Sequence, residues 1–385
     1  MKLSRPFILL PFAGAVVAGL LPARRRNAET WLAGLVALAG FGVVLHLWPA
    51  VTTGGVLRQE IAWVPALGLD IVWRLDGFAW MFAALVTGIG FLVVLYSRYY
   101  MSPDDPVPRF FAFLLAFMGA MLGLVLSGNL IQLVFFWELT SLFSFLLIGY
   151  WHHTAAARDG ARMALTVTAL GGLCLLAGVL LLGHIAGSYD LDVVLAAGNR
   201  IRADPLQLLA LLLVLLGALT KSAQFPFHFW LPQAMSAPTP VSAFLHSATM
   251  VKAGVFLLLR FWPVLSGTDA WFWLVGGAGL LTLLLGATAA VFQQDLKAVL
   301  AYSTISHLGL ITMLIGLGST LGAVAAIFHI VNHATFKASL FMAAGAVDHE
   351  TGTRDLRRLG GLRHVMPITA TLAVIASAAM AGVPL

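Results

Sequence analysis

Lysines, histidines and one glutamate lie inside apolar stretches of this chain, where a charge is costly. A lysine at bilayer depth costs roughly 2.5–3.5 kcal/mol on insertion scales, so a buried lysine usually has a function. Lysine, histidine and glutamate exchange protons when burial or a moving partner shifts their pKa values. These residues predict a proton relay made of Glu138, Lys221, Lys252, His246, His307, His329, His333 and Lys337.

The stretch 217–254 is the centre of this pattern. An apolar helix predicted over 206–233 carries Lys221, and Pro226 removes a backbone donor, so the helix should break near Pro226. A broken helix at membrane depth is tolerated only inside protein or beside a wet cavity. Glu138, in IQLVFFWELTSLFSFLLIGY, is the natural partner of Lys221, and separating the two would release a proton. The structural alternatives are a buried ion pair that fixes helix packing, or a lysine that snorkels to the interface.

A second helix, predicted over 239–262, places His246 and Lys252 in one apolar run. Lys252 is too deep to reach the interface easily, which favours a relay role. His246 lies six residues earlier and points to another side, so a packing histidine is an equal alternative. Lys297 follows a predicted helix start and is either an interfacial charge or a member of the relay.

His329, His333 and Lys337 are spaced at i, i+4 and i+8, so they form one stripe on a helix. Two histidines at this spacing can bind zinc, but H-I-V-N-H lacks the glutamate of a zincin and has no evident third ligand. A hydrated proton path uses the stripe better, because histidine titrates near neutral pH. His307, four residues after Ser303, is the next candidate. We expect no metal site.

The composition predicts an integral membrane protein. The chain is 60% hydrophobic and 10% charged, whereas soluble domains have about 25% charged residues. Its single cysteine, Cys174, cannot form an intrachain disulfide. The sequence has no GxGxxG, Walker or GxSxG motif, so we expect neither an organic cofactor nor an enzyme. The net charge of +6 is explained by membrane orientation without nucleic acid.

The apolar segments predict an all-α polytopic fold of about twelve membrane helices. Residues 56–75 are shorter runs around a proline and a glycine, which predict an external hairpin. A signal peptide at the start is less consistent with the three arginines that follow at once. The predicted spans are 6–22, 31–50, 77–97, 110–127, 129–150, 161–186, 206–233, 239–262, 271–292, 294–316, 319–346 and 366–385.

Lysines and arginines in the loops predict the orientation. With the N-terminus outside, twelve lie inside and seven outside, in agreement with the positive-inside rule. The inner group is Arg24, Arg25, Arg26, Arg98, Arg109, Arg158, Arg162, Lys297, Arg354, Arg357, Arg358 and Arg363, and the outer group is Lys2, Arg5, Arg58, Arg74, Arg200, Arg202 and Arg260.

Four long motifs carry a resemblance to a known family. FWELTSLFSFLLIGY, TKSAQFPFHFWLPQAMSAPTPVSAFLHSATMVKAGVFLL, DLKAVLAYSTISHLG and HATFKASLFMAAGAV resemble the antiporter-like subunits of respiratory complex I. They are more similar still to the large A subunit of Mrp-type monovalent cation/proton antiporters. The resemblance covers nearly the whole chain. It implies N-terminal helices over 1–109 and two inverted five-helix repeats, 110–262 and 271–385.

The resemblance also assigns roles to residues. The family's glutamate–lysine pair falls on Glu138 and Lys221, and its central bridging residues fall on Lys252, His307 and the His329–His333–Lys337 stripe. The family's second broken helix carries a further lysine, after a Pro-Leu-Asn-Gly-Phe-like run. This sequence ends at AGVPL within that helix, so we expect a fragment truncated at its C-terminus.

These observations predict one component of a multi-subunit Na⁺/H⁺ antiporter in the cell (inner) membrane. Its partners would be other subunits of the complex, membrane lipid, H⁺ and Na⁺, with K⁺ or Li⁺ as the other cations. The nearest alternative is a proton-pumping subunit of an NADH–quinone oxidoreductase or a membrane hydrogenase. An inactive scaffold is the alternative from another class.

Overall fold

The structure is a computed structural model that describes residues 5–22, 26–64, 68–102 and 104–383. Several residues of the predicted features lie outside this description. They are Lys2, Arg24 and Arg25 of the charge count, the side chains of Arg5 and Arg26, residues 65–67 of the predicted hairpin, and residues 384–385 of the last predicted span.

Apolar helices build almost all of the described chain, which confirms an all-α polytopic membrane protein. Within the described ranges, eight helices are long and apolar enough to cross a membrane, and three shorter apolar helices accompany them. The count of twelve spans stays a prediction. The eight are Asn27–His46, Gly77–Tyr100, Val107–Val125, Leu130–Ile148, Ala155–Ala186, Thr239–Leu265, Asp269–Val291 and Leu296–Gly316, and the shorter ones are Ile8–Leu20, Gln207–Lys221 and Pro367–Met380.

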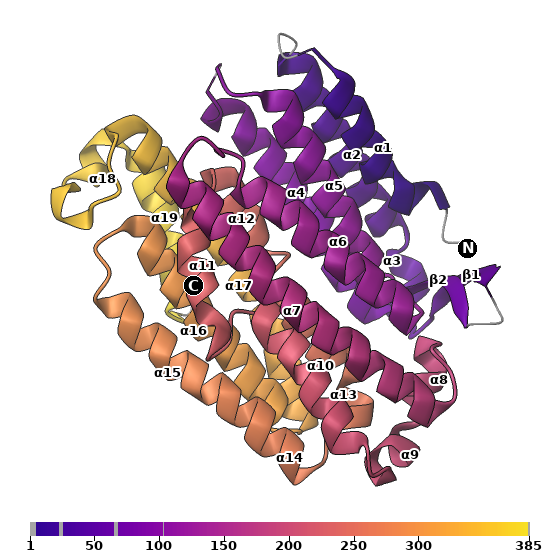
Figure 1. Ribbon diagram of the computed structural model, residues 1–385. Coiled ribbons are helices and arrows are strands. Elements are labelled where there is room, and N and C mark those ends of the chain that lie inside the picture. Colours follow the sequence, from indigo (N-terminus) through magenta and orange to yellow (C-terminus); the bar gives the residue numbers. More distant parts are fainter. Residues whose placement is uncertain (1–4, 23–25, 65–67, 103, 384–385) are drawn as a thin grey trace.

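The N-terminal part packs as a layer on the rest of the bundle (Figure 1). Helix α1 packs against α5 and α2 against α4, because each presents an apolar face to the other. The strand pairing of the predicted hairpin is confirmed, since β1 and β2 pair antiparallel, with Leu57 opposite Leu75 and Ile61 opposite Ile71, and its external position stays a prediction. The elements are α1 (Arg5–Leu20), α2 (Arg26–His46), α3 (Trp48–Thr52), β1 (Leu57–Val64), β2 (Leu69–Leu75), α4 (Gly77–Tyr100) and α5 (Val107–Val125).

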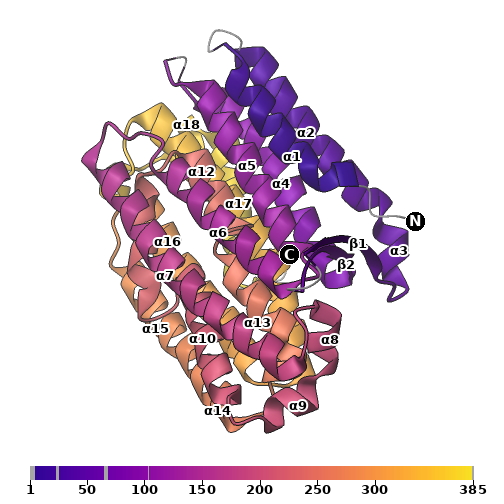
Figure 2. The same cartoon turned by 45° about the vertical axis from the view of Figure 1, so that its right-hand side comes forward.

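The central part contains the 32-residue helix α7 and the predicted break near Pro226. Helix α7 runs along the bundle from the α11 region to α8 (Figures 1 and 2). The elements are α6 (Leu130–Ile148), α7 (Ala155–Ala186), α8 (Leu191–Ala196), α9 (Gly198–Ala203), α10 (Gln207–Lys221), η2 (Phe227–Phe229), α11 (Trp230–Gln233), η3 (Ala234–Ser236), α12 (Thr239–Ser247) and α13 (Lys252–Leu265).

The remaining elements follow α13 in the chain. They are α14 (Asp269–Trp271), the π-helical turn η4 (Phe272–Gly276), α15 (Gly277–Val291), α16 (Leu296–Gly316), α17 (Thr320–Thr351), η5 (Leu356–Arg358), α18 (Leu362–Val365) and α19 (Pro367–Met380).

The same local chemistry begins and ends the corresponding helices of the two parts. Helices α7 and α17 are both 32 residues long. Each has a hydroxyl side chain at its N-cap, which accepts a backbone N–H three residues on, and each ends at a glycine in the left-handed region. Helices α6 and α16 likewise begin at a capping Asn129 and Asp295, and these two residues bridge to Asp190 and Asp355.

The predicted break near Pro226 is confirmed. Helix α10 ends at Lys221, and the chain passes through a turn at 222–226 into the short helices η2, α11 and η3. Ala223 in this turn has a φ of 48°, a conformation that favours glycine, and its side chain is buried. The start of the turn, residues 222–224, is buried inside protein, whereas Phe225 and Pro226 at its end are exposed on the surface of the chain.

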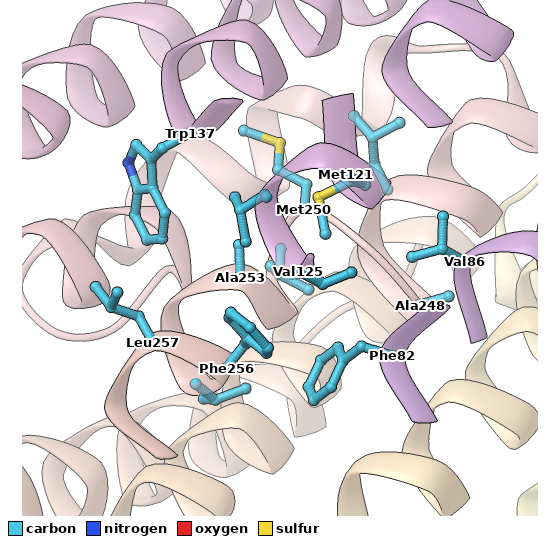
Figure 3. Close-up of a cluster of buried hydrophobic side chains, with 14 of the residues drawn as sticks. Phe82, Val86, Met121, Val125, Trp137, Ala248, Met250, Ala253, Phe256 and Leu257 are labelled. Atoms are coloured by element: carbon cyan, nitrogen blue, oxygen red, sulfur yellow. The ribbon is translucent and has the colours of Figure 1, made fainter. Parts of the chain in front are cut away.

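The span predicted over 239–262 corresponds to Thr239–Leu265, but the prediction that His246 and Lys252 share one continuous helix is wrong. Helix α12 ends at Ser247 and α13 begins at Lys252, so residues 248–251 form a second interruption. Figure 3 shows Ala248, Met250 and Ala253 packed among side chains of neighbouring helices, including Trp137. Close packing surrounds this irregular backbone and keeps it away from lipid.

Candidate functional site

Lys221 is the last residue of α10 and is completely buried. Its Nζ donates hydrogen bonds to the Trp137 carbonyl oxygen at 2.9 Å and to Ser141 Oγ at 2.6 Å, both on α6. The same nitrogen lies 5.0 Å from the centroid of the Trp137 ring, a cation–π distance. Helix α6 therefore holds this ammonium in the interior, and the lysine does not snorkel.

Glu138 lies on α6 between the two residues that bind Lys221, but the structure does not join it directly to the lysine. Among the described residues, its Oε1 is buried with no hydrogen-bond partner, and Lys221 gives its hydrogen bonds to Trp137 and Ser141. Gly172 on α7 leaves room for the carboxylate, since a Cβ there would overlap Oε1. An unpartnered buried carboxylate oxygen is a place for a proton or a water molecule.

The two interruptions of the helices touch each other. Ser222 Oγ, just after Lys221, donates a hydrogen bond of 2.6 Å to the carbonyl oxygen of Val251, just before Lys252. Helices α10 and α13 cross here at Gly254, where a Cβ would overlap a backbone oxygen of α10. A single hydrogen bond therefore joins the residue that follows Lys221 to the residue that precedes Lys252.

Lys252, the first residue of α13, is completely buried. Its Nζ folds back to donate a hydrogen bond to the Ser247 carbonyl oxygen at the C-terminal end of α12. That end carries partial negative charge and stabilises a cation. The same Nζ lies 2.6 Å from Nδ1 of His333 on α17. A proton in this contact can be held by either nitrogen.

Three histidines continue the line. His307 Nδ1 on α16 lies 3.0 Å from His329 Nε2 on α17. The ring centroid of His307 is 5.6 Å from that of His333, and all three rings pack against Phe336. Nε2 of His333 is buried and without a partner in the described chain, so this face of the cluster has an unused proton site.

Lys337 ends the stripe one turn beyond His333 and is completely buried. Its Nζ hydrogen-bonds Ser303 Oγ and lies 3.4 Å from the Leu300 carbonyl oxygen, both on α16. The 3.6-residue periodicity predicted this shared face correctly, because α17 is uninterrupted through these positions.

Two other buried bases lie outside this line. The two ring nitrogens of His246 are buried without partners in the described structure, and the ring packs between Trp230 and Phe341. Lys297 is 2% exposed and donates to the Ala237 carbonyl oxygen at 2.9 Å. The structure therefore uses Lys297 to hold the end of the short-helix segment.

Two pairs of helices carry different residues at the same spacing from their N-caps. Nine residues after the N-cap, α6 has Glu138 and α16 has Thr304. Eighteen residues after the N-cap, α7 has Gly172 and α17 has Lys337. The carboxylate of Glu138 reaches Gly172 across the contact of α6 with α7.

Sequence reasoning missed Ser141, Ser303 as a lysine ligand, and the break at 248–251. Ser141 lies three residues after Glu138, on the same face of α6, and that spacing was an available signal. The segment 248–251 contains no proline or glycine, so nothing local marks the interruption. Among the described residues, no group of three or more His, Cys, Asp or Glu could hold a metal ion.

An arginine–aspartate network anchors α13 at its far end. Arg260 Nη1 lies 2.5 Å from Asp76, the N-cap of α4, and Arg74 pairs with both Asp76 and Asp192. Burial alone would raise the pKa of Asp76, but hydrogen bonds and charge from Arg260, together with Arg74, hold this pKa well below its ordinary value. The network fixes the helix that begins with Lys252.

The fold and the site define a polytopic helical membrane protein that lines its interior with protonatable side chains. Residues 127–385 match the family described as NADH:quinone oxidoreductase/Mrp antiporter, TM, and residues 63–111 match the N-terminus of complex I chain 5. The chain belongs to the NADH:quinone oxidoreductase/Mrp antiporter membrane family.

Known relatives extend this likeness. The chain is 70% identical to a probable A/B subunit of a K⁺/H⁺ antiporter of Rhizobium meliloti, over 100% of this chain and 38% of the relative. It is 49% identical to the A subunit of the Na⁺/H⁺ antiporter of Alkalihalophilus pseudofirmus, over 97% of this chain and 48% of the relative. The chain thus spans half or less of the length of these relatives.

Solved structures agree with the fold. The Mrp complex from a Dietzia species superposes with a TM-score of 0.91 at 40% identity, covering 98% of this chain and 41% of the matched chain. Respiratory complex I from Thermus thermophilus superposes with a TM-score of 0.85 at 25% identity, covering 98% of this chain and 78% of the matched chain.

Proposed function

We propose that this chain is part of a subunit of a monovalent cation/proton antiporter and that it conducts protons sideways through the membrane interior. The observation that carries the proposal is the contact of 2.6 Å between Lys252 Nζ and His333 Nδ1, two completely buried bases on different helices. Two bases in hydrogen-bond contact share one proton, and a structural role does not require a histidine there. The chain would act as a secondary transporter and not as an enzyme.

The route follows the buried groups. A proton near Glu138 would pass to Lys221 across Ser141, whose hydroxyl is 2.6 Å from the ammonium. The proton would next pass to Lys252, because the Ser222–Val251 hydrogen bond holds the end of α10 against the start of α13. From Lys252 it would pass to His333. From there it would reach His307, His329 and Lys337. His246 stays a predicted member, since its ring nitrogens have no partner in the described chain.

The exchanged cation is Na⁺ in this proposal, with K⁺ as the direct competitor. The relative at 49% identity is named for Na⁺ and the relative at 70% identity is named for K⁺. Li⁺ is a further cation to test. The relay itself does not select among cations, because its bases bind protons.

The family also supports a proposal about the partner subunits, the membrane and the repeats of this chain. We infer that the chain works with other antiporter subunits in the cell membrane, with its N-terminus outside. We also propose repeats over 110–262 and 271–385 in an inverted relation, preceded by helices over 1–109. The equal lengths and matched caps of α7 and α17 support the repeats.

Transport by the full-length protein in its complete complex tests the proposal. Everted vesicles from a host without other antiporters are energised by respiration, and a fluorescent pH probe reports the collapse of the gradient when Na⁺, K⁺ or Li⁺ is added. We expect collapse in the wild type, and none in Lys221→Ala or Lys252→Met, because each removes a buried base from the line. Arg200→Gln removes an exposed charge in the short helix α9, which carries none of the relay residues, and should transport normally.

Each outcome has a distinct meaning. Collapse in the two lysine variants at the wild-type rate would make the buried bases structural and would favour a scaffold. Absence of collapse with every cation in the wild type would favour a redox-driven proton pump instead. That second candidate rests on the likeness to complex I at a TM-score of 0.85.

A further inference from the structure

A basic cavity lies at one end of the bundle, away from the buried relay. Its volume is about 390 Å³, within the roughly 300–1,000 Å³ typical of small-ligand sites. Arg109 at the start of α5 and Arg158 and Arg162 in the first turns of α7 line it, together with Tyr150 after the end of α6. None of the described residues that line this cavity is acidic.

The cavity joins a charged rim to an apolar floor. Phe113, more than one turn inside α5, and Phe145 and Leu146, in the last turn of α6, line its apolar side. The arginines lie where these helices begin or end, which is the depth of lipid headgroups. This layout matches a molecule with an anionic head and an apolar tail.

The arginines have hydrogen-bond donors to spare. An arginine has five N–H groups. Arg109 donates from Nη2 to the Tyr150 carbonyl oxygen at 2.9 Å, and its Nε is buried with no partner in the described chain. Tyr150 is 1% exposed, and its hydroxyl is also without a partner among the described residues. Arg158 binds the carbonyl oxygens of the preceding turn through Nη1.

Arg162 is partly neutralised, because its Nη2 lies 2.5 Å from Asp159 Oδ1 in an exposed pair. Surface pairs of this kind are weak, so a phosphate can compete for the guanidinium. Arg109 and Arg158 have no such carboxylate partner in the described structure, and they form the strong part of the rim.

We propose that this cavity binds an anionic phospholipid, with its phosphate on Arg109 and Arg158 and an acyl chain along Phe113, Phe145 and Leu146. Guanidinium groups bind phosphate through paired N–H donors. A basic pocket between membrane helices is a suitable site for an anionic headgroup. Free phosphate satisfies only the rim, whereas a phospholipid also covers the apolar floor.

Native mass spectrometry of the full-length protein in its complex tests the site. Phosphatidylglycerol, phosphatidylcholine with the same acyl chains, and inorganic phosphate are the three probes. We expect the wild type to retain phosphatidylglycerol in preference to phosphatidylcholine. The double variant Arg109→Gln/Arg158→Gln should bind phosphatidylglycerol about thirtyfold more weakly, since each basic residue near an anionic lipid contributes about fivefold. Arg200→Gln, an exposed arginine in α9 next to Gly187 at the C-terminal end of α7, is the matched control and should bind as the wild type does.

A second variant protects the test against misfolding, because Arg109 also bonds the Tyr150 carbonyl oxygen. Leu146→Trp keeps the arginines and fills the apolar floor, so it should also lose phosphatidylglycerol. Equal loss in Arg200→Gln, or equal binding of the two lipids, would overturn the proposal. Phosphate competition together with normal lipid retention in Leu146→Trp would identify a small-anion site instead. Unchanged lipid counts with loss of a neighbouring protein from the double variant would assign the face to that protein.

Discussion

Gly254→Ala tests whether the crossing of α10 and α13 brings the two interruptions together. A Cβ at this position would overlap the carbonyl oxygen of Ala218 and the hydroxyl of Ser222. The first of these atoms is helical backbone and cannot swing away. Relief therefore requires the two helices to move apart at the point where Ser222 binds Val251.

Two opposing effects set the magnitude. Replacing glycine by alanine inside a helix stabilises by up to about 1 kcal/mol through backbone entropy. Overpacking a tight contact costs about 1–3 kcal/mol. Gly277→Ala in α15 has the first effect alone, because a Cβ there meets no atom within 4 Å. The free energy of unfolding should therefore be about 1–3 kcal/mol lower for Gly254→Ala than for Gly277→Ala.

The assay is reversible unfolding of the purified full-length protein in mixed micelles, followed by vesicle transport of the same variants. Gly254→Ala should also slow cation-driven proton movement, because the clash displaces the Ser222–Val251 hydrogen bond from between the lysine positions. Gly277→Ala should transport as the wild type does. Equal unfolding free energies for the two variants would refute the tight crossing, and with it the joining of the two breaks at this point.

Two further substitutions test the anchored end of α13 and the place of the Glu138 carboxylate. Asp76→Asn should destabilise by about 3 kcal/mol at pH 7, since it leaves Arg260 and Arg74 without their shared carboxylate. The folded pKa of Asp76 is depressed, so its contribution is complete above the unfolded pKa of about 3.9 and is lost as pH falls. The difference in free energy of unfolding between the wild type and Asp76→Asn should become smaller below about pH 4. A difference that grows there would contradict this sign. Gly172→Ala should slow transport by pushing the Glu138 carboxylate from its place while changing stability little, and a wild-type rate in vesicles would show that this position of the carboxylate is unimportant.

Composition and local periodicity determined the class of protein and much of its site. A run of about 20 apolar residues satisfies its own backbone groups in a bilayer as a helix, so the recurrence of such runs predicted the polytopic helical fold. The spacing of His329, His333 and Lys337 predicted one face because helical periodicity holds along uninterrupted α17. Pro226 marked the first break because a proline removes a donor whatever surrounds it.

Contacts between distant segments decided the rest. Whether Lys252 reaches His333 depends on how α13 and α17 pack. The residue spacing within one helix does not predict its contact with the other. The second break, at 248–251, has no local signal and is held by packing and by the hydroxyl of Ser222. Charge type and the family resemblance both pair Glu138 with Lys221, whereas in the folded chain the lysine donates its hydrogen bonds to Trp137 and Ser141. A sequence determines which groups are costly to bury, and only tertiary structure decides which partner offsets that cost, because the partner comes from another helix.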